Sequence, residues 1–156
     1  MVKKMNNIAY ISGGIELLDL IKPLWEKLNN HHRGNSNKFS HNYEKFTFEL
    51  RKEKFYNKDL KVNIDLVKDL NRETYIGYCI STINSDLVGE VDSLYLEKEC
   101  RGQGIGEELM ERALIYLNDN NSKKKIIGVA EGNEEVLNFY KKFKFYKRTI
   151  ILEEII

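Results

Sequence analysis

A glycine-rich segment, Arg101-Gly102-Gln103-Gly104-Ile105-Gly106, contains the residue types and spacing most suggestive of chemistry. It follows a strand-like run and opens a helix-like one. A helix N-terminus presents unpaired N–H groups and the positive end of the helix dipole, so it binds anions. Glycines let the backbone approach a phosphate without an intervening Cβ, and Arg101 adds a positive charge. The segment therefore predicts an anion site, with an ordinary glycine-rich turn as the alternative.

The glycine spacing argues against two common phosphate sites. Glu107 stands where the dinucleotide pattern G-x-G-x-x-G would place its third glycine, and the sequence contains no G-x-x-x-x-G-K-[ST] motif. A regulator that binds ATP or NAD is therefore disfavoured.

Together with its flanks, the segment resembles the GNAT superfamily of acyl-CoA-dependent N-acyltransferases. Residues 101–106 fit the family's R/Q-x-x-G-x-G/A signature, and residues 90–96 (EVDSLYL) are similar to its fourth strand. Residues 133–140 (NEEVLNFY) are similar to its N-x-x-A-x-x-F-Y helix. The resemblance implies one GNAT-type N-acetyltransferase domain over residues 1–156, which transfers acetyl from acetyl-CoA to a primary amine.

The resemblance also implies how coenzyme A is bound. The glycine segment would hold the pyrophosphate, the main chain of the preceding strand would pair with the pantetheine arm, and Tyr140 would lie near the thioester sulfur. No metal is expected. The predicted cofactor contacts are Leu94, Tyr95, Leu96, Arg101, Gly102, Gln103, Gly104, Ile105, Gly106, Asn133 and Tyr140.

Two positions depart from the family pattern. Lys144 precedes Phe145 where a glycine is usual, so the lysine must adopt a left-handed backbone at some cost or the helix must end differently. Val136 replaces the usual alanine, which is a small packing change beside the cofactor arm.

Acetyl transfer from a thioester poses two proton problems, because the amine must lose a proton and the leaving thiolate benefits from gaining one. Tyr140 is the candidate donor, since a phenol with a pKa of about 10 keeps its proton at neutral pH. Core packing is the alternative for this residue. Glu90 is the candidate base, and Asp92 lies on the same strand face, where it could bind a cationic acceptor. A solvated face or a structural ion pair is the alternative for both carboxylates.

The resemblance places the acceptor pocket against the first two helices, so His32, Phe39 and Tyr43 are predicted to line it with Asp92. Helix capping is the alternative role for the histidine. The sequence does not distinguish a small-molecule acceptor from a protein amine. Cys79 and Cys100 are interpreted as reduced packing residues, which favours a ternary-complex mechanism. A non-catalytic module that binds or senses coenzyme A is the alternative function.

Hydrophobic periodicity predicts the elements that position these residues. Their order predicts an α/β domain with a mixed, mostly antiparallel sheet flanked by helices. A loop is expected over 31–40, the second helix is expected to turn its charges outward, and the last strand, ending in Ile155-Ile156, could pair across a homodimer. The predicted strands are 7–11, 60–67, 74–82, 86–97, 124–130 and 145–152, and the predicted helices are 16–30, 41–54, 104–118 and 133–143.

Composition is that of an ordinary globular domain. The chain has 156 residues and a formal net charge of +1, which gives no reason to expect nucleic acid or a membrane as partner. Its start, MVKKMNNIAYIS, turns polar at once and does not predict a secretory signal. We therefore expect a cytoplasmic protein.

Overall fold

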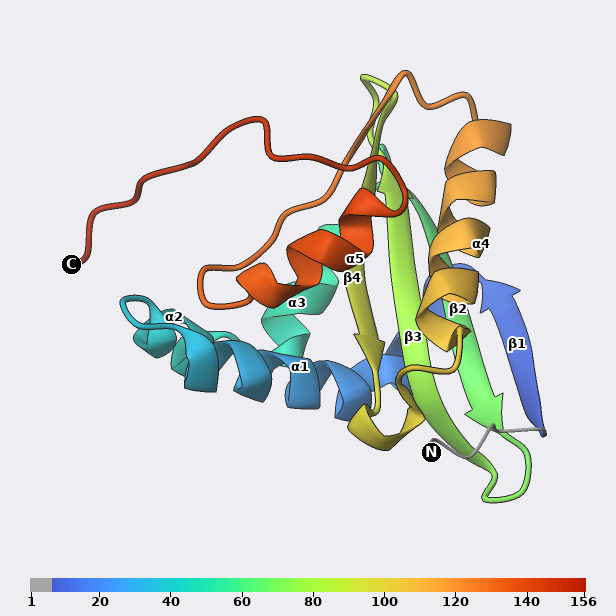
Figure 1. The fold of residues 1–156 in the computed structure, drawn as a ribbon. Helices are drawn as coiled ribbons and strands as arrows, with labels where there is room; N and C mark the ends of the chain where they lie inside the picture. The colour runs from blue at the N-terminus through green and yellow to red at the C-terminus, as the bar shows by residue number, and fades with distance from the viewer. Residues whose placement is uncertain (1–6) are drawn as a thin grey trace.

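The computed structural model describes residues 7–156, and one five-stranded sheet forms the centre of that part of the chain (Figure 1). The first four strands pair antiparallel in sequence order, and the fifth runs parallel to the fourth. This confirms the predicted α/β fold with a mixed, mostly antiparallel sheet. The strands are β1 (Ile8–Gly13), β2 (Lys61–Asp69), β3 (Thr74–Ile83), β4 (Val88–Leu96) and β5 (Lys124–Ile126).

Helices cover both faces of the sheet and create two hydrophobic cores. The 3-10 helix η1 (Ile15–Ile21), α1 (Lys22–Asn35) and α3 (Phe48–Phe55) pack on one face, whereas α4 (Ile105–Asp119) packs on the other. Neighbouring residues of β2 show the division, because Leu66 belongs to the first core and Val67 to the second. Successive side chains of a strand point to opposite faces, so a sheet covered on both sides buries both sets.

The N-terminal helical region differs from the prediction. Helix α1 continues to Asn35, so half of the predicted 31–40 loop is helical. The predicted helix over 16–30 is divided between η1 and α1, with Pro23 in the first turn of α1. A proline is tolerated there because the first N–H groups of a helix have no intrahelical partner.

The predicted helix over 41–54 was wrong in its continuity and its orientation. It consists of α2 (Ser40–Lys45) and α3, and the side chain of Thr47 caps α3 by accepting a hydrogen bond from the N–H of Leu50 at 3.2 Å. The new start changes which face is buried, so Phe48 and Phe55 are buried while Leu50 is 48% exposed. The charged face of α3 consequently turns toward β4 rather than only outward.

The C-terminal third is less regular than predicted. Only residues 124–126 of the predicted 124–130 strand are a strand, and the predicted 133–143 helix consists of η3 (Glu134–Val136) and α5 (Leu137–Lys141). The closing strand over 145–152 is not formed, and Ile150, Ile151 and Leu152 are at least 78% exposed. Three consecutive apolar residues lack the alternation of a half-buried strand, and β5 is too short to offer a long pairing edge. Pairing of this segment across a homodimer stays a prediction.

Two further observations concern possible partners. Within residues 7–156, no helix is long and apolar enough to cross a membrane. Residues 1–6, the first half of the segment for which no secretory signal was predicted, lie outside the described residues.

Lys144 adopts a left-handed backbone with a φ of 67°, the first of the two outcomes expected for it. The N–H of Lys144 donates to the carbonyl of Lys141, and the N–H of Phe145 donates to that of Tyr140. These two bonds form a Schellman motif, in which glycine usually occupies the left-handed position. The left-handed backbone of Lys144 therefore allows the two hydrogen bonds that end α5, at the cost of local backbone strain.

Replacing Lys144 with glycine should raise the free energy of unfolding by about 1 kcal/mol, because the left-handed backbone no longer opposes a Cβ. Lys141→Gly, at the last residue of α5, should instead lower it by about 1 kcal/mol. Urea unfolding of both variants measures the difference. Equal destabilisation by the two changes would contradict the strain assigned to Lys144.

Candidate active site

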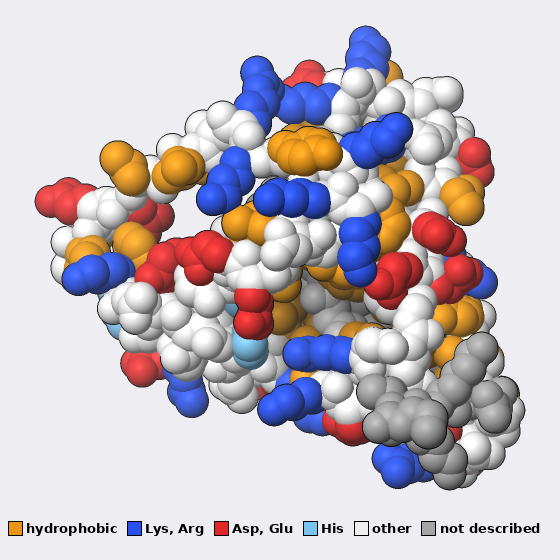
Figure 2. All heavy atoms as spheres, in the orientation of Figure 1, with side chains coloured by type: hydrophobic (Ala, Val, Ile, Leu, Met, Phe, Trp, Pro, Cys, Tyr) orange, Lys and Arg blue, Asp and Glu red, His pale blue; other side chains and the backbone are white. Residues whose placement is uncertain are grey.

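The candidate site lies where β4 and β5 separate. The two strands pair only from Val88 to Glu90, the last pair being Glu90 with Ile126. Beyond that point, residues 91–94 of β4 and residues 127–130 of the diverging segment line a cavity of about 210 Å³. Side chains from α1 and α5 complete its walls, and Figure 2 shows this face hollowed between those helices. The split therefore forms a cavity whose lining includes side chains that pack on both faces of the sheet.

The separation also leaves main-chain groups of β4 without a neighbouring strand. The N–H of Glu97 donates to the carbonyl of Ile76 on β3 at 2.8 Å. Because alternate strand residues direct their main-chain groups to opposite sides, those of Leu94 and Leu96 point toward the missing neighbour. An extended ligand could pair with this edge as an added strand would. Leu94 and Leu96 therefore present the free main-chain edge that their predicted contacts with the pantetheine arm require, and the contacts themselves stay predictions.

A β-bulge shapes the same part of β4. Ile80 pairs with Ser93 and Ser81 pairs with Val91, so Asp92 is the extra residue. Bulges bend a strand and redirect side chains, often beside active sites. Here the bulge places Asp92 both on the cavity wall and opposite α3.

Tyr140 of α5 lines the cavity and packs against the core on the side of α4, and Asn133 lines the cavity as well. Burial raises the pKa of Tyr140 to about 12, so its phenol holds a proton at neutral pH. The side-chain oxygen of Asn133 lies 3.3 Å from Nε2 of His31, which ties the segment before α5 to α1. Both residues thus line the cavity, and the cofactor contacts expected of them stay predictions.

The glycine segment forms the N-terminus of α4. Gly102 and Gly104 have positive φ angles of 77° and 86°, and a Cβ on either would meet no atom within 4 Å. The N-cap residue of α4 is Gly104, which has no side chain to cap the helix. The first N–H groups of a helix have no intrahelical partner, and the space beside Gly102 and Gly104 leaves room for an anion there.

Acidic residues in the first turn of α4 are neutralised by ion pairs. Glu107 lies 3.3 Å from Lys142, and Glu108 lies 2.9 Å from Arg112. Because both carboxylates are paired, they repel an anion at this helix N-terminus less than unpaired carboxylates would. Figure 2 shows Lys and Arg side chains gathered over α5 and the segment after it, where Lys141, Lys142 and Lys144 are exposed.

Arg101 is directed back toward β4. Its Nε donates to the main-chain oxygen of Leu96 at 2.9 Å, and its guanidinium lies 5.7 Å from the ring centre of Tyr95. Tyr95 in turn donates to Glu97 at 3.0 Å, and Glu97 pairs with Lys27 of α1 at 2.6 Å. The three predicted cofactor contacts Tyr95, Leu96 and Arg101 consequently form one connected group outside the cavity wall.

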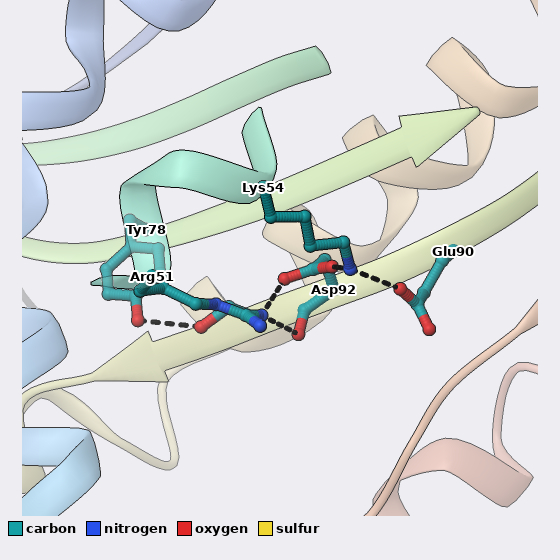
Figure 3. Close-up of polar contacts among 6 residues, drawn as sticks. Arg51, Lys54, Tyr78, Glu90 and Asp92 are labelled. Atoms are coloured by element: carbon teal, nitrogen blue, oxygen red, sulfur yellow. Dashed lines mark hydrogen bonds and ion pairs between the residues drawn. The ribbon is translucent and has the colours of Figure 1, made fainter. Parts of the chain in front are cut away.

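Four charged residues meet beside the bulge (Figure 3). The side chain of Asp92 is only 1% exposed and accepts hydrogen bonds from both Arg51 and Lys54 of α3. Lys54 also lies 3.1 Å from Glu90. Lys54 contacts both carboxylates, so Glu90 and Asp92 share a face of β4 as expected. The cluster is neutral overall.

Glu90 is the more accessible of the two carboxylates, with 27% of its side chain exposed. Burial raises its pKa, Asp92 raises it further, and Lys54 partly offsets both effects. A raised pKa makes a carboxylate a stronger base. Glu90 nevertheless does not belong to the described residues that line the cavity, so a water would have to connect it to an amine inside.

Aromatic side chains form the wall on the side of α1. Trp25 and Phe46 are in edge contact at 5.7 Å, and the rings of His32 and Tyr43 are 5.5 Å apart. All four line the cavity, whereas Phe39, which was predicted with them, does not belong to the described lining. Burial lowers the pKa of His32 to about 4, so this imidazole is neutral at physiological pH.

Sequence reasoning missed Arg51 and Lys54. Their spacing of three residues places them on one helix face, and this spacing could have indicated a shared partner. That face was instead interpreted as exposed to solvent. Both cysteines are free and buried, as predicted. Within the described residues, no group of three or more His, Cys, Asp and Glu side chains is arranged to hold a metal ion.

Comparison with known proteins identifies a family. Residues 24–145 match the model of the acetyltransferase (GNAT) family. An uncharacterized N-acetyltransferase from Archaeoglobus fulgidus is 42% identical over 53 residues, which span 34% of this chain and 36% of that protein. The chain thus aligns with about a third of that relative's length.

Solved structures share the fold. A Pyrococcus furiosus protein provisionally described as an acetyl transferase superposes with a TM-score of 0.72 at 19% identity, covering 96% of this chain and 100% of that one. A GCN5-related N-acetyltransferase from Ralstonia eutropha JMP134 gives 0.71 at 11% identity, covering 96% and 99%. Aminoglycoside N-acetyltransferase AAC(6')-Iy, solved in complex with CoA, gives 0.66 at 12% identity, covering 99% of both chains.

Proposed function

Because the chain belongs to the acetyltransferase (GNAT) family, we propose that it transfers acetyl from acetyl-CoA to a primary amine in the split between β4 and β5. The observation that carries this proposal is the shared cavity. A buried phenol, an unpaired strand edge and an aromatic wall meet there, close to a helix N-terminus suited to phosphates. The solved structure of an aminoglycoside N-acetyltransferase with CoA on the same fold supports the choice of cofactor.

The residues fit coenzyme A along its length. The N–H groups of residues 104–106 would bind the pyrophosphate, with Gly102 and Gly104 leaving room for it. The pantetheine arm would pair with the main chain of Leu94, beside Asn133. Arg101 already occupies the carbonyl of Leu96, which retains a second lone pair for the arm. The thioester would then reach the cavity at Tyr140.

The chemistry requires one proton to leave the amine and one to reach the sulfur. Glu90, with its raised pKa, accepts the amine proton through water, and the free amine attacks the thioester carbonyl. The carbon–sulfur bond then breaks, the hydroxyl of Tyr140 gives its proton to the departing thiolate, and the second proton shed by the new amide nitrogen returns to Tyr140 through water. Asp92 holds Arg51 and Lys54 in place and is not itself free to accept a proton.

The acetyl group passes directly from donor to acceptor. Cys79 is fully buried within the sheet, and burial raises its pKa, so it is a poor nucleophile. Cys100 is also buried with a raised pKa. Initial-rate measurements should therefore give intersecting double-reciprocal lines, whereas parallel lines would indicate an acetylated enzyme intermediate.

Glu90→Gln should lower kcat/KM most between the raised pKa of Glu90 and the pKa of the amine, which is about 10 for an alkylamine. In that range the wild type removes the proton and the variant cannot. The difference should shrink toward high pH, where solution supplies free amine. Glu111→Gln, on an exposed position of α4, is the matched control. A loss that is uniform with pH would assign Glu90 a binding or structural role.

A non-catalytic coenzyme A-binding module is the alternative function. It would use the same helix N-terminus without turnover, so release of thiol from acetyl-CoA in the presence of an amine would exclude it.

A further inference from the structure

The cavity that would receive the amine is small and has one apolar side. Its volume of about 210 Å³ lies below the range of about 300–1,000 Å³ typical of ligand pockets, and the thioester end of the cofactor must share it. The rings of Trp25, Tyr43 and Phe46 supply apolar surface, with Trp25 and Phe46 meeting edge to face. An amine with a compact aromatic body can pack against such rings.

Two residues of the cavity lining each carry a buried polar atom that has no hydrogen-bond partner within residues 7–156. The two atoms are Nδ1 of His32 and Nε of Arg51. Buried polar atoms are almost always paired in folded proteins, so unpaired ones at a binding cavity indicate a ligand group. Nε of Arg51 can only donate, whereas Nδ1 of His32 donates or accepts according to its tautomer. A hydroxyl group can satisfy either atom.

The charges around the cavity disfavour a second positive charge on the acceptor. In the described part of the chain, Arg51 and Asp92 are the charged residues of the lining. Asp92 is already neutralised by Arg51 and Lys54, and His32 is neutral because burial lowers its pKa to about 4. The lining therefore offers a polycation no unpaired carboxylate.

We propose that the acceptor is a compact primary amine with an aromatic body and a hydroxyl group, and without a second positive charge. This inference rests on the proposed function, since it assumes that the amine occupies this cavity. His32 is then the residue that selects for the hydroxyl. Aromatic faces also attract ammonium groups, so a polyamine is the strongest competing acceptor class.

Trp25 makes the inference testable without catalysis, because it is the single tryptophan of the chain and lines the cavity. Quenching of its fluorescence measures the binding of tyramine, phenethylamine and spermidine to the wild type. We expect tyramine to bind about tenfold more tightly than phenethylamine, the value of one added hydrogen bond, and spermidine to bind most weakly. In His32→Leu, the two aromatic amines should bind equally.

Binding of spermidine at least as tight as that of tyramine would overturn the inference, as would an undiminished hydroxyl preference in His32→Leu. The ranking in the wild type decides the question even if the variant fails to fold. Because binding is measured without acetyl-CoA, the predicted ranking without acetylation would contradict the proposed function alone. Acetylation of polyamines in preference to tyramine would contradict the acceptor class alone.

Discussion

Replacing Tyr140 with phenylalanine should lower kcat by about two orders of magnitude or more while acetyl-CoA affinity stays within a few-fold of the wild type. The change keeps the ring, which packs beside Phe139 at 5.4 Å, and removes only the hydroxyl at the cavity. A positioned proton donor is typically worth about 10²–10⁴-fold in rate. Steady-state kinetics and calorimetry separate the effect on chemistry from the effect on binding.

Two controls distinguish the hydroxyl's role from packing. Tyr116→Phe removes from α4 another hydroxyl whose pKa burial raises, outside the described cavity lining, and should leave kcat unchanged. An acyl donor with a more acidic thiol should reduce the penalty of Tyr140→Phe, because a better leaving group needs less help. If kcat survives the change, Tyr140 is only a core residue.

Replacing Gly104 with valine should weaken coenzyme A binding by about 10- to 100-fold. The Cβ of the new side chain would meet no protein atom within 4 Å, so the side chain would fill space at the N-terminus of α4 that the proposal gives to the pyrophosphate. Losing one charge-assisted hydrogen bond costs about 1.5–3 kcal/mol, which corresponds to this range. Calorimetric titration measures the affinity, and circular dichroism checks the fold.

Gly104 has a positive φ, so valine there also strains the backbone. Gly106→Ala avoids this problem, because its Cβ would make an ordinary contact 3.6 Å from Phe139 inside the helix. This variant should be at least as stable as the wild type and should keep its coenzyme A affinity, because the signature of residues 101–106 accepts either glycine or alanine at this position, which makes it the matched control. Unchanged affinity in Gly104→Val would remove the phosphate site from α4.

The sequence predicted best the elements whose hydrophobic period is local and uninterrupted. Strands β2, β3 and β4 and helix α4 lie within two residues of the predicted bounds because alternation or a 3.6-residue period marks each of them. The glycine segment was also predictable from local sequence, because its whole pattern lies within the six residues 101–106. The predicted cofactor contacts Tyr140 and Asn133 line the same cavity as the predicted acceptor-pocket residues His32, Tyr43 and Asp92, and the roles of all five stay predictions.

Features that depend on tertiary contacts were not predictable in this way. The break before α3 depends on the cap at Thr47, and it turns Arg51 and Lys54 toward a carboxylate about forty residues away in sequence. The apolar residues after Phe145 carry strand propensity, but propensity does not form a strand without a neighbour to pair with. The split beyond Glu90 has no sequence signature of its own.

Amine-dependent release of coenzyme A from acetyl-CoA, with the product identified by mass spectrometry, tests the central claim most directly. The purified chain should release thiol continuously when a suitable amine is present, and the amine should gain one acetyl group on nitrogen. A panel of aromatic amines, polyamines, amino acids and peptides covers the acceptor classes. Tight binding of coenzyme A without turnover of any of these amines would contradict the account and favour the non-catalytic module.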